Sequence, residues 1–353
     1  MLRFFQKNAV GECHGQGIDS ARSLHWALST TMPSRGNMKK QWTISDVPPQ
    51  IGKRVLITGA NSGIGYHAAL TLARKGAQVI LACRDKQRGE EALSRLNAAA
   101  PNARAELAIL DLASLASVRQ FAQRELAEQR PIHVLVNNAG VMAPPKRLET
   151  ADGFELQFGT NVLGHFALTA LLMPALELAA TGSPDRPRIV TIASIAHKQG
   201  QIDFKDLQSK KTYSPMQSYR QSKLADLMFA FELDRRLRAA NSRVMSVAAH
   251  PGVANTNLFR GGDRSAISRA ARDLLSHFIG ALLNTDYAGA LPTLFAATSR
   301  DVSDGGYYGP QGFLEARGSR IGEASVARQA KDASNAGRLW QVCEELTQVR
   351  LRP

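Results

Sequence analysis

From Lys53 onward, short apolar runs alternate with longer amphipathic segments, and no other feature of the chain restricts the possible fold as strongly. The runs are rich in Val, Ile, Leu and Ala, which is typical of strands buried on both faces of a parallel sheet. The segments between them are long enough to form the right-handed crossover helices that connect parallel strands. We therefore predict an α/β fold, built on a doubly wound parallel sheet with helices on both faces.

The bounds of the predicted elements follow from where the apolar runs begin and end. The predicted strands are Arg54–Thr58, Gln78–Cys83, Arg104–Leu110, Val134–Asn137, Arg188–Ala193 and Val244–His250. The predicted helices are Tyr66–Lys75, Arg88–Ala99, Leu115–Gln129 and Gly159–Leu178. No repeat, low-complexity block or linker interrupts residues 53–314, so we expect one domain there.

Residues 1–37 differ in composition, because Gly, Ser, His and Arg are mixed there without an apolar period. Polar residues interrupt the short apolar start, which argues against a secretory signal, and acidic residues argue against a mitochondrial presequence. Met38 is an alternative start of the chain. We predict a disordered N-terminal extension over residues 1–37 and a folded domain over residues 38–353. A chain that begins at Met38 is expected to fold and act like the full one, because an extension with no face to bury gains nothing from ordering.

The net charge of +14 at pH 7 would suit a nucleic-acid partner, but the Lys and Arg residues are scattered along the chain. Aromatic residues make up only 6% of the sequence, so stacking platforms for bases are few. We therefore predict a solvated basic surface and no nucleic-acid binding.

Cys13, Cys83 and Cys343 are odd in number and far apart, so they predict neither a disulfide framework nor a metal cluster. This usage favours a reducing compartment, and we predict a cytoplasmic location. The best candidate for a membrane span, residues 166–180, is interrupted by Pro and Glu, which argues against integral membrane insertion. A homo-oligomer is compatible with all these features.

A glycine-rich segment joins the first predicted strand to the helix that follows. It reads Thr58-Gly59-Ala60-Asn61-Ser62-Gly63-Ile64-Gly65. Glycines let the backbone turn sharply and approach a pyrophosphate, and a helix N-terminus offers free N–H groups to it. We therefore predict a Rossmann-type dinucleotide site formed by Gly59, Asn61, Ser62, Gly63, Ile64 and Gly65. By itself the segment favours a plain tight strand-to-helix turn, and its spacing differs from GxGxxG, so the dinucleotide site depends on support from the rest of the chain.

Further motifs follow in order along the chain. They are Asn137-Asn138-Ala139-Gly140, Asn161, Ser194, Tyr219 with Lys223, and His250-Pro251-Gly252. With the glycine segment they resemble the TGxxxGxG turn, the NNAG strand end and the catalytic residues of the short-chain dehydrogenase/reductase family, over about residues 40–350. The segments at 81–85, 160–166 and 193–197 most resemble the branch of the retinol dehydrogenases and protochlorophyllide reductases. The resemblance implies an oxidoreductase that uses a nicotinamide cofactor.

Tyr219 and Lys223 are four residues apart, so on a helix they share one face. A neighbouring ammonium stabilises a phenolate, and a tyrosine held in this way can act as a general acid or base. The resemblance implies that Ser194 polarises the carbonyl oxygen of the substrate, that Lys223 also bonds the nicotinamide ribose, and that Asn161 fixes a water that relays protons. A nucleophilic role for Ser194 is disfavoured because no GxSxG elbow surrounds it.

The second predicted strand ends at Cys83, a position where an acidic residue would hold the ribose 2′-hydroxyl of NAD. Arg84 follows directly, and a guanidinium suits a 2′-phosphate. We therefore predict NADP(H), with the alternative that Asp85 accepts an NAD ribose.

The resemblance implies more cofactor contacts along the chain. Asp111 and Leu112 would lie beside the adenine, although Asp111 also suits the N-cap of the following helix. Thr256 would lie near the nicotinamide carboxamide. The remaining contacts would come from Asn138, Ala139, Gly140, Pro251, Gly252 and Val253.

Apolar residues recur at helical intervals over Ser265–Leu283, opposite Arg269 and Arg272. In the family this region covers the substrate site, which favours a lipophilic alcohol or carbonyl. Plain core packing explains the same stripe equally well, and peripheral membrane contact is a weaker alternative. Farther along, Gly305–Pro310 resembles the exit of the last strand, and a C-terminal helix is expected over Ala333–Val349.

His165, His197 and His250 have no metal-ligand spacing, so we predict no metal site and expect hydrogen-bonded structural histidines. Two other function classes compete: a non-catalytic NADP(H)-binding regulatory protein of the same fold, and a sugar-nucleotide epimerase. The presence of all four catalytic residues argues against the first, and the glycine spacing argues against the second. The sequence thus predicts an NADP(H)-dependent oxidoreductase that interconverts a small-molecule alcohol and carbonyl, with Tyr219 as general acid/base.

Overall fold

The computed structural model describes residues 41–182, 184–252 and 286–351. The predicted N-terminal extension lies outside the described residues, and so does the amphipathic stretch Ser265–Leu283. The same holds for two predicted cofactor contacts, Val253 and Thr256.

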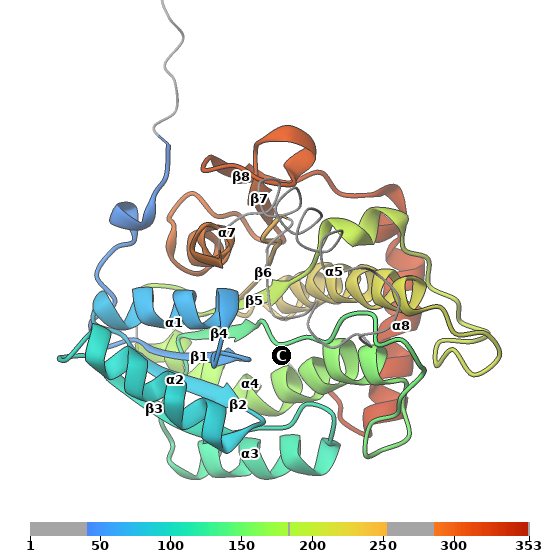
Figure 1. The fold of residues 1–353 in the computed structure, drawn as a ribbon, viewed down its shortest axis with the longest axis horizontal. Coiled ribbons are helices and arrows are strands. Elements are labelled where there is room, and N and C mark those ends of the chain that lie inside the picture. The colour runs from blue at the N-terminus through green and yellow to red at the C-terminus, as the bar shows by residue number, and fades with distance from the viewer. Residues whose placement is uncertain (1–40, 183, 253–285, 352–353) are drawn as a thin grey trace, which may run out of the picture. The chain divides into compact units, whose positions relative to one another are not determined.

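An eight-stranded sheet forms the centre of the fold (Figure 1). Its strands are β1 (Arg54–Thr58), β2 (Gln78–Cys83), β3 (Arg104–Ile109), β4 (Val134–Asn137), β5 (Arg188–Ile192), β6 (Met245–Ala249), β7 (Tyr307–Pro310) and β8 (Ile321–Glu323). They lie in the order β3-β2-β1-β4-β5-β6-β7-β8, and only β8 runs antiparallel to its neighbour. The strand order reverses between β1 and β4, which is where sheets of this kind open a crevice at the carboxyl ends of the strands. The predicted doubly wound α/β fold is confirmed.

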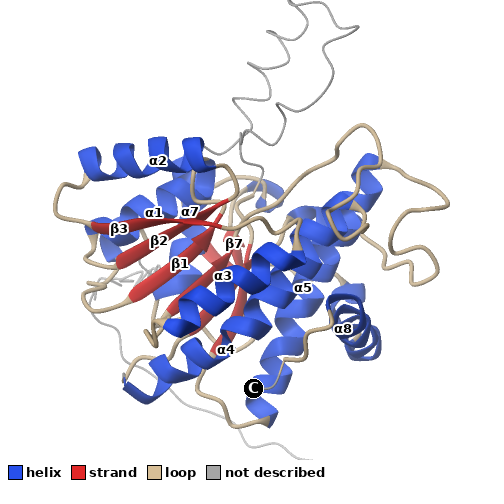
Figure 2. Cartoon of the chain, turned by 90° about the horizontal axis from the view of Figure 1, so that it is seen from below, coloured by secondary structure: helices blue, strands red, loops and turns tan. Residues whose placement is uncertain are grey.

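Helices cover both faces of the sheet (Figure 2). One face carries α1 (Gly63–Arg74), α2 (Lys86–Ala99) and α7 (Asp286–Thr298). The other carries α3 (Leu115–Ala127), α4 (Gly164–Gly182) and α5 (Pro215–Ala239), with α8 (Ala333–Thr347) packed on α5. Each face of the sheet packs against its helices to form a hydrophobic core. Side chains of β1 alternate between the two: Val55 and Ile57 point into the core beneath α1, α2 and α7, and Leu56 points into the core on the other face.

The six predicted strands agree with the structure to within one residue at each end, but not all of them are buried. The prediction is wrong for β3, which lies at the edge of the sheet and is only partly covered. The sheet also continues past the predicted last strand, because β8 folds back along β7. Neither β8 nor α7 was predicted.

Two predicted helices begin at different residues, for identifiable reasons. Helix α1 begins at Gly63 instead of Tyr66, so the glycine turn itself supplies its first residues. Helix α2 begins at Lys86 because the carboxylate of Asp85 caps it, accepting the Arg88 N–H at 3.0 Å.

The helix predicted over Gly159–Leu178 is divided. A π-helical segment, η2 (Phe158–Leu163), precedes α4, which then continues to Gly182. Together they form the one helical stretch, among the described residues, that is long and apolar enough to cross a membrane. However, 78% of its apolar window is buried inside the fold, so it has the character of a central core helix.

Candidate active site

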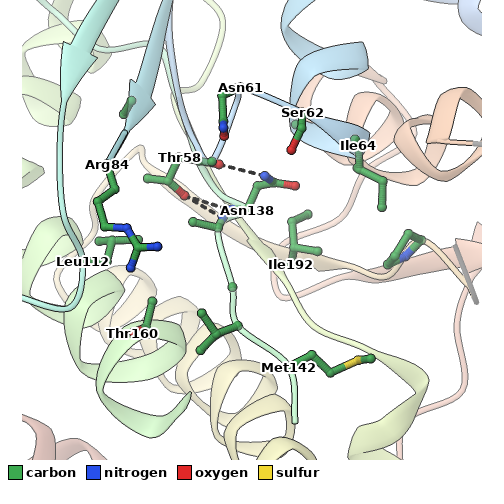
Figure 3. Close-up of a pocket in the computed structure, with 18 of the residues that line it drawn as sticks. Thr58, Asn61, Ser62, Ile64, Arg84, Leu112, Asn138, Met142, Thr160 and Ile192 are labelled. Atoms are coloured by element: carbon green, nitrogen blue, oxygen red, sulfur yellow. Dashed lines mark hydrogen bonds between the residues drawn. The ribbon is translucent and has the colours of Figure 1, made fainter. Parts of the chain in front are cut away.

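A cavity of about 370 Å³ opens at the carboxyl ends of β1, β4 and β5 (Figure 3). The glycine turn, the loops after β2 and β4, the end of β5 and helix α5 all contribute to its wall. Most of the predicted site residues line it: Gly59, Asn61, Ser62, Gly63, Ile64, Gly65, Arg84, Asp111, Leu112, Asn138, Ala139, Gly140, Ser194, Tyr219, Lys223, Pro251 and Gly252. The structure therefore brings together, in one cavity, residues that are up to 193 positions apart (252 − 59).

The glycine turn has no room for side chains at two positions. Gly59 has φ +67°, in the left-handed region, and a Cβ on it would lie 2.9 Å from the Ala139 Cα. A Cβ on Gly65 would lie 2.5 Å from Asn138 Nδ2 and 2.7 Å from the carbonyl oxygen of Gly59. These glycines allow the loop after β4 to pack directly against the turn.

Thr58 joins the ends of β1 and β4 beneath this turn. Its hydroxyl accepts the N–H groups of Asn138 and Ala139, each at 2.9 Å, and Asn138 Nδ2 donates to the Thr58 carbonyl at 2.7 Å. Buried His165 lies behind it, with Nδ1 2.8 Å from the Asn161 carbonyl oxygen. Nδ1 must therefore carry the proton, so Nε2 accepts from the Thr58 hydroxyl at 2.9 Å. Burial lowers the pKa of His165 to about 4, which keeps the ring neutral.

The N-terminus of α1 faces the cavity with its first-turn residues Gly63, Ile64 and Gly65. Ser62 is the N-cap, but its side chain makes no capping hydrogen bond. The first-turn N–H groups therefore remain available to an anion, and the helix dipole favours negative charge there. A pyrophosphate fits this arrangement.

Positive charge lines the cavity beyond β2. Arg84 extends its guanidinium along the cavity wall near Leu112 (Figure 3), and Arg88 also lines the cavity. Asp85 lines the cavity as well; Oδ1 of its carboxylate caps α2, and Oδ2 lies 3.7 Å from Arg88 Nε. The thiol of Cys83 is buried, and burial raises its pKa to about 11, so it adds no charge here.

Asp111 lines the cavity but is not the N-cap that the sequence suggested. Its carboxylate accepts the Ala113 N–H at 3.0 Å, in a turn. Ser114 caps α3 instead, and its hydroxyl accepts the Ser117 N–H. The N-cap alternative for Asp111 is therefore wrong, because α3 begins three residues later than it would require.

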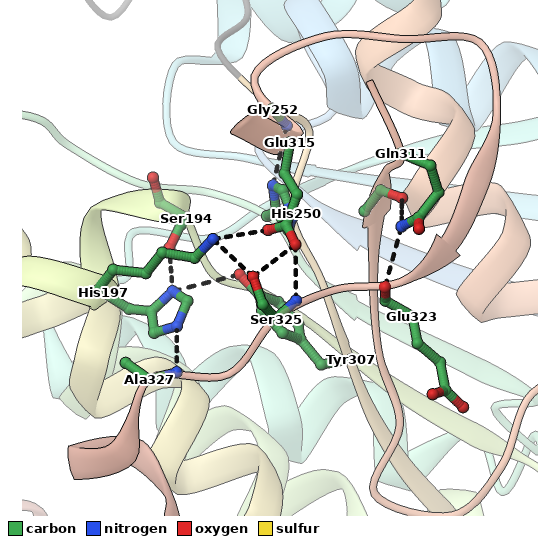
Figure 4. Close-up of polar contacts among 12 residues, drawn as sticks. Ser194, His197, His250, Gly252, Tyr307, Gln311, Glu315, Glu323, Ser325 and Ala327 are labelled. Carbon is green, nitrogen blue, oxygen red and sulfur yellow. Dashed lines mark hydrogen bonds and ion pairs between the residues drawn. The ribbon is translucent and has the colours of Figure 1, made fainter. Parts of the chain in front are cut away.

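Ser194 follows β5 and caps the short 3-10 helix η3 (Ile195–Gln199). Its Oγ accepts the Ala196 N–H at 3.2 Å, which leaves the hydroxyl proton free to donate. Its carbonyl oxygen accepts from His197 Nδ1 at 2.7 Å, so a buried ring holds the Ser194 backbone from behind (Figure 4).

Tyr219 and Lys223 lie on α5 and are both nearly buried, with 8% and 5% exposure. The Lys223 ammonium donates to the Ile192 carbonyl at 2.8 Å and to Asp226 Oδ2 at 2.9 Å. Burial alone would lower the pKa of Lys223, but the charge of Asp226 and the proximity of Tyr219 raise it above its ordinary value. Burial raises the pKa of Asp226 to about 6 against the opposing effect of Lys223. The contact of 2.9 Å between the ammonium and the carboxylate has the geometry of a charged pair.

Asn161 does not line the cavity, unlike the other described site residues. It lies in η2 with no exposed surface, and its side chain holds the loop after β4 through the Val141 N–H and carbonyl, at 2.9 and 3.1 Å. Its Nδ2 also donates to Ser222 Oγ on α5 at 2.9 Å. The Asn161 side chain thus connects η2 with the loop after β4 and with α5. The neighbouring residue Thr160 lines the cavity instead.

No group of three or more metal-ligating side chains occurs among the residues that the structure describes, so the three histidines form no metal site there. His165 and His197 are hydrogen-bonded, as predicted. His250 is only partly so: Nδ1 accepts the Gly252 N–H at 3.2 Å, but buried Nε2 has no hydrogen-bond partner among the described residues and lies 3.6 Å from Glu315 Oε2.

Several residues that shape the site were not predicted. Thr58, His165 and Asp226 hold predicted site residues by direct contacts, and Glu315 reaches the His197–His250 region from the far end of the chain (Figure 4). For Asp226 a signal was present, because it follows Lys223 by three residues on a helix. For Glu315 no local pattern gave one.

Comparisons with known proteins agree with this geometry. The family model described as short chain dehydrogenase matches residues 53–264. Polyprenol dehydrogenase of Mus musculus is 42% identical over 299 residues, which cover 83% of each chain. Retinol dehydrogenase 12 of Homo sapiens is 39% identical over 301 residues, which cover 85% of this chain and 87% of the relative.

Solved structures show the same likeness. The crystal structure of an uncharacterized protein from Mycobacterium paratuberculosis has a TM-score of 0.72 and 39% identity, covering 89% of this chain and all (100%) of that one. A gluconate 5-dehydrogenase from Beutenbergia cavernae, described as NAD(P) dependent and with NADP bound at low occupancy, has a TM-score of 0.51 and 26% identity over 70% of this chain and 90% of that one. The chain belongs to the short chain dehydrogenase family of oxidoreductases, in the branch that contains the retinol dehydrogenases.

Proposed function

We propose that this protein is an NADP(H)-dependent oxidoreductase that interconverts a lipophilic alcohol and the corresponding carbonyl compound. The observation that carries the proposal is that Ser194, Tyr219 and Lys223 line the same cavity as the glycine turn. A hydrogen-bond donor, a proton donor and an ammonium thus share one site with a phosphate-binding turn. The proposal assigns the cofactor and substrate sites to residues 38–353.

The glycine turn fits a dinucleotide. Gly59 and Gly65 leave no side chain between the turn and the loop after β4, and the α1 N-terminus offers its free N–H groups to a pyrophosphate. When bound, the nicotinamide ring supplies or accepts the hydride. Its ribose would be held by Lys223, whose ammonium already uses two of its protons on Ile192 and Asp226.

The protein's own residues would move the proton. Ser194 has a free hydroxyl proton with which to bond and polarise the substrate oxygen. Tyr219 would then give a proton to that oxygen in the reduction and take it back in the oxidation. Lys223 would stabilise the phenolate that remains. The water relay through Asn161 stays a prediction: both Nδ2 protons are used on Val141 and Ser222, while Oδ1 accepts one N–H and retains a lone pair for a water.

NADP(H) is favoured over NAD(H) by the charges at the end of β2. Arg84 and Arg88 both line the cavity, and a 2′-phosphate would lie between guanidinium groups. Asp85 also lines the cavity, but Oδ1 of its carboxylate, the group that would have to accept an NAD ribose hydroxyl, already accepts the Arg88 N–H as the cap of α2. The bound NADP of the gluconate 5-dehydrogenase structure is consistent with this assignment.

A lipophilic substrate is favoured by the apolar part of the cavity wall. Val141, Met142, Ile192 and Ile195 line it near Ser194 and Tyr219. Two of the related proteins are named for retinol and polyprenol, both lipophilic alcohols. The described cysteines Cys83 and Cys343 are free and buried, which suits the reducing environment of a cytoplasmic location.

The test is turnover by the purified full chain with NADPH and a panel of aldehydes and ketones of increasing chain length. NADPH oxidation, followed by loss of its fluorescence, is expected to rise with the apolar length of the substrate. NADP+ with the matching alcohols tests the reverse direction. If the chain binds NADPH tightly but turns over none of these compounds, the alternative of a non-catalytic NADP(H)-binding regulatory protein would be favoured instead.

A further inference from the structure

The ammonium of Lys223 has three protons, and two of them are committed inside the protein. One goes to the Ile192 carbonyl at the end of β5, and another goes to Asp226 on the next turn of α5. One proton is left for a partner in the cavity, which Lys223 lines. The direction of that last proton is therefore fixed by the other two contacts.

The pair of Lys223 and Asp226 is almost fully removed from solvent, with side-chain exposures of 7% and 4%. A buried ammonium beside a carbonyl alone would lose its proton readily, because burial penalises the charged form. The carboxylate of Asp226 offsets this penalty, and the pKa of Lys223 rises instead of falling. Removing one partner from such a pair leaves an uncompensated charge.

Other titratable groups face this pair without supplying a second counter-charge. Tyr219 lies on the same helix, and the neutral ring of His165 faces Lys223 from α4. Cys343 faces Asp226 from α8, and burial together with the negative charge of Asp226 raises the pKa of its thiol, so it stays protonated. Among the described residues, Asp226 is thus the carboxylate that holds Lys223.

We propose that Asp226 is a positioning residue for the reaction, which keeps Lys223 charged and orients its remaining proton into the cavity. This inference rests on the proposed function, because it assigns the role of Lys223 in binding the nicotinamide ribose and supporting Tyr219. It goes beyond that function by placing the control of the Lys223 charge in a residue that contacts neither substrate nor cofactor.

Two substitutions separate charge from geometry. Asp226→Asn keeps an acceptor oxygen of the same size but removes the charge, and Asp226→Leu removes both. Asp234→Asn is the matched control, because Asp234 is also buried on α5, pairs with Arg238 at 2.8 Å and does not line the cavity.

The first readout is NADPH affinity, measured by fluorescence from about neutral pH to about pH 10, where free lysine titrates. For Asp226→Asn, affinity near neutral pH is expected to be close to that of the wild type, and its alkaline loss is expected to begin about one pH unit earlier or more. For Asp226→Leu, affinity near neutral pH is expected to fall on the order of tenfold, because one oriented contact is lost, and its alkaline loss is expected to begin at least as early as in Asp226→Asn. The alkaline limb of kcat/KM is expected to move in parallel with affinity.

The second readout needs no cofactor. A lysine whose pKa is raised in the folded state contributes stability below its unfolded pKa, and this is lost as the pH rises through the folded value. Thermal melting of the apoprotein is therefore expected to show an alkaline loss of stability that starts earlier in Asp226→Asn. Asp234→Asn is expected to leave the position of both alkaline limbs unchanged.

Unchanged alkaline limbs in Asp226→Asn would overturn the proposal. A wild-type chain that binds NADPH but reduces no carbonyl would overturn the proposed function. The inference about Asp226 would then be decided by the pH dependence of NADPH binding and of thermal melting. If Asp226→Asn does not fold, Lys223→Met is compared with Lys223→Met/Asp226→Asn near neutral pH. The double variant is expected to melt higher, because the second change removes the unpaired charge, and no such recovery would contradict the inference.

Discussion

The two sides of the crevice are held by contacts of different kinds. On the β1–β4 side, backbone groups of the glycine turn pack directly against the loop after β4, and Thr58 joins the two. On the β5–β7 side, side chains tie the helix η3, which Ser194 caps, to the C-terminal part of the chain. The first side requires glycines, which let the backbone segments come close enough for the Thr58 and Asn138 contacts, whereas the second is held by long side chains that bridge separate segments.

The contacts on the β5–β7 side join segments that are far apart in sequence. Lys198 Nζ donates to Glu315 Oε2 at 2.9 Å and to Ser325 Oγ at 2.8 Å. The Ala327 N–H donates to His197 Nε2 at 3.3 Å. Glu315 itself has φ +58°, in the left-handed region, so its loop is strained and needs these contacts to hold it. We expect this side to be the more adaptable one, which suits its proposed role in receiving the substrate.

The largest effect is expected where the two sides meet, at Tyr219. Tyr219→Phe removes the proton donor and little of the binding surface, so turnover should fall by about 10²–10⁴-fold with NADPH affinity nearly unchanged. Steady-state kinetics measure the turnover, and fluorescence titration measures the NADPH affinity. Near-normal turnover in this variant would show that another group supplies the proton.

The next effect tests the β1–β4 side. In Gly65→Ala the new Cβ would lie 2.5 Å from Asn138 Nδ2, so the turn and the loop after β4 must separate. We expect about a hundredfold loss of NADPH affinity and a lower melting temperature, from overpacking. Gly337→Ala is the matched control: Gly337 lies within α8 with nothing near its Cβ position, so that variant should melt slightly higher. Equal NADPH affinity in the two variants would contradict the close-packed turn.

Arg84→Ala sharpens the assignment of the cofactor on the same side. Loss of one charge-assisted contact is expected to weaken NADPH binding by about tenfold or more while NADH binding changes little. Lys86→Ala is the control, because Lys86 is 76% exposed, pairs with Glu90 and does not line the cavity. An unaltered ratio of NADPH to NADH affinity would mean that the 2′-phosphate lies elsewhere.

The same contrast explains how much could be predicted from the sequence. The glycine turn and the Tyr219–Lys223 pair are local patterns, whose spacing alone predicts a strand-to-helix turn and a shared helix face. The apolar runs likewise predicted the parallel strands, because each run is recognised from residues within one short segment. These parts of the fold and of the site follow from residues close together in the chain.

The rest depends on contacts through space. Lys198 and Glu315 are 117 residues apart, and no periodicity relates them. Asn161 was predicted to fix a water, and this stays a prediction, but the bracing contacts that its side chain makes from a π-helical turn carry no signal in a single sequence. The contacts predicted for Val253 and Thr256 stay predictions.

The smallest effect is expected at the β5–β7 side, from Glu315→Gln. Burial alone would raise the pKa of Glu315, but hydrogen bonds from Ser325 and Lys198 lower it to about 2. A carboxyl whose pKa is lowered on folding contributes stability above its unfolded value of 4.5, and this is lost as the pH falls toward about 2. We therefore expect the variant to melt about 2 °C lower near neutral pH and to approach the wild type as the pH falls through this range. Glu323→Gln, at the exposed position of β8, should match the wild type throughout. The KM for the carbonyl should rise a few-fold in Glu315→Gln alone. If both variants melt and react alike at every pH, Glu315 does not hold η3, and the β5–β7 side must be fixed by the His197 contacts instead.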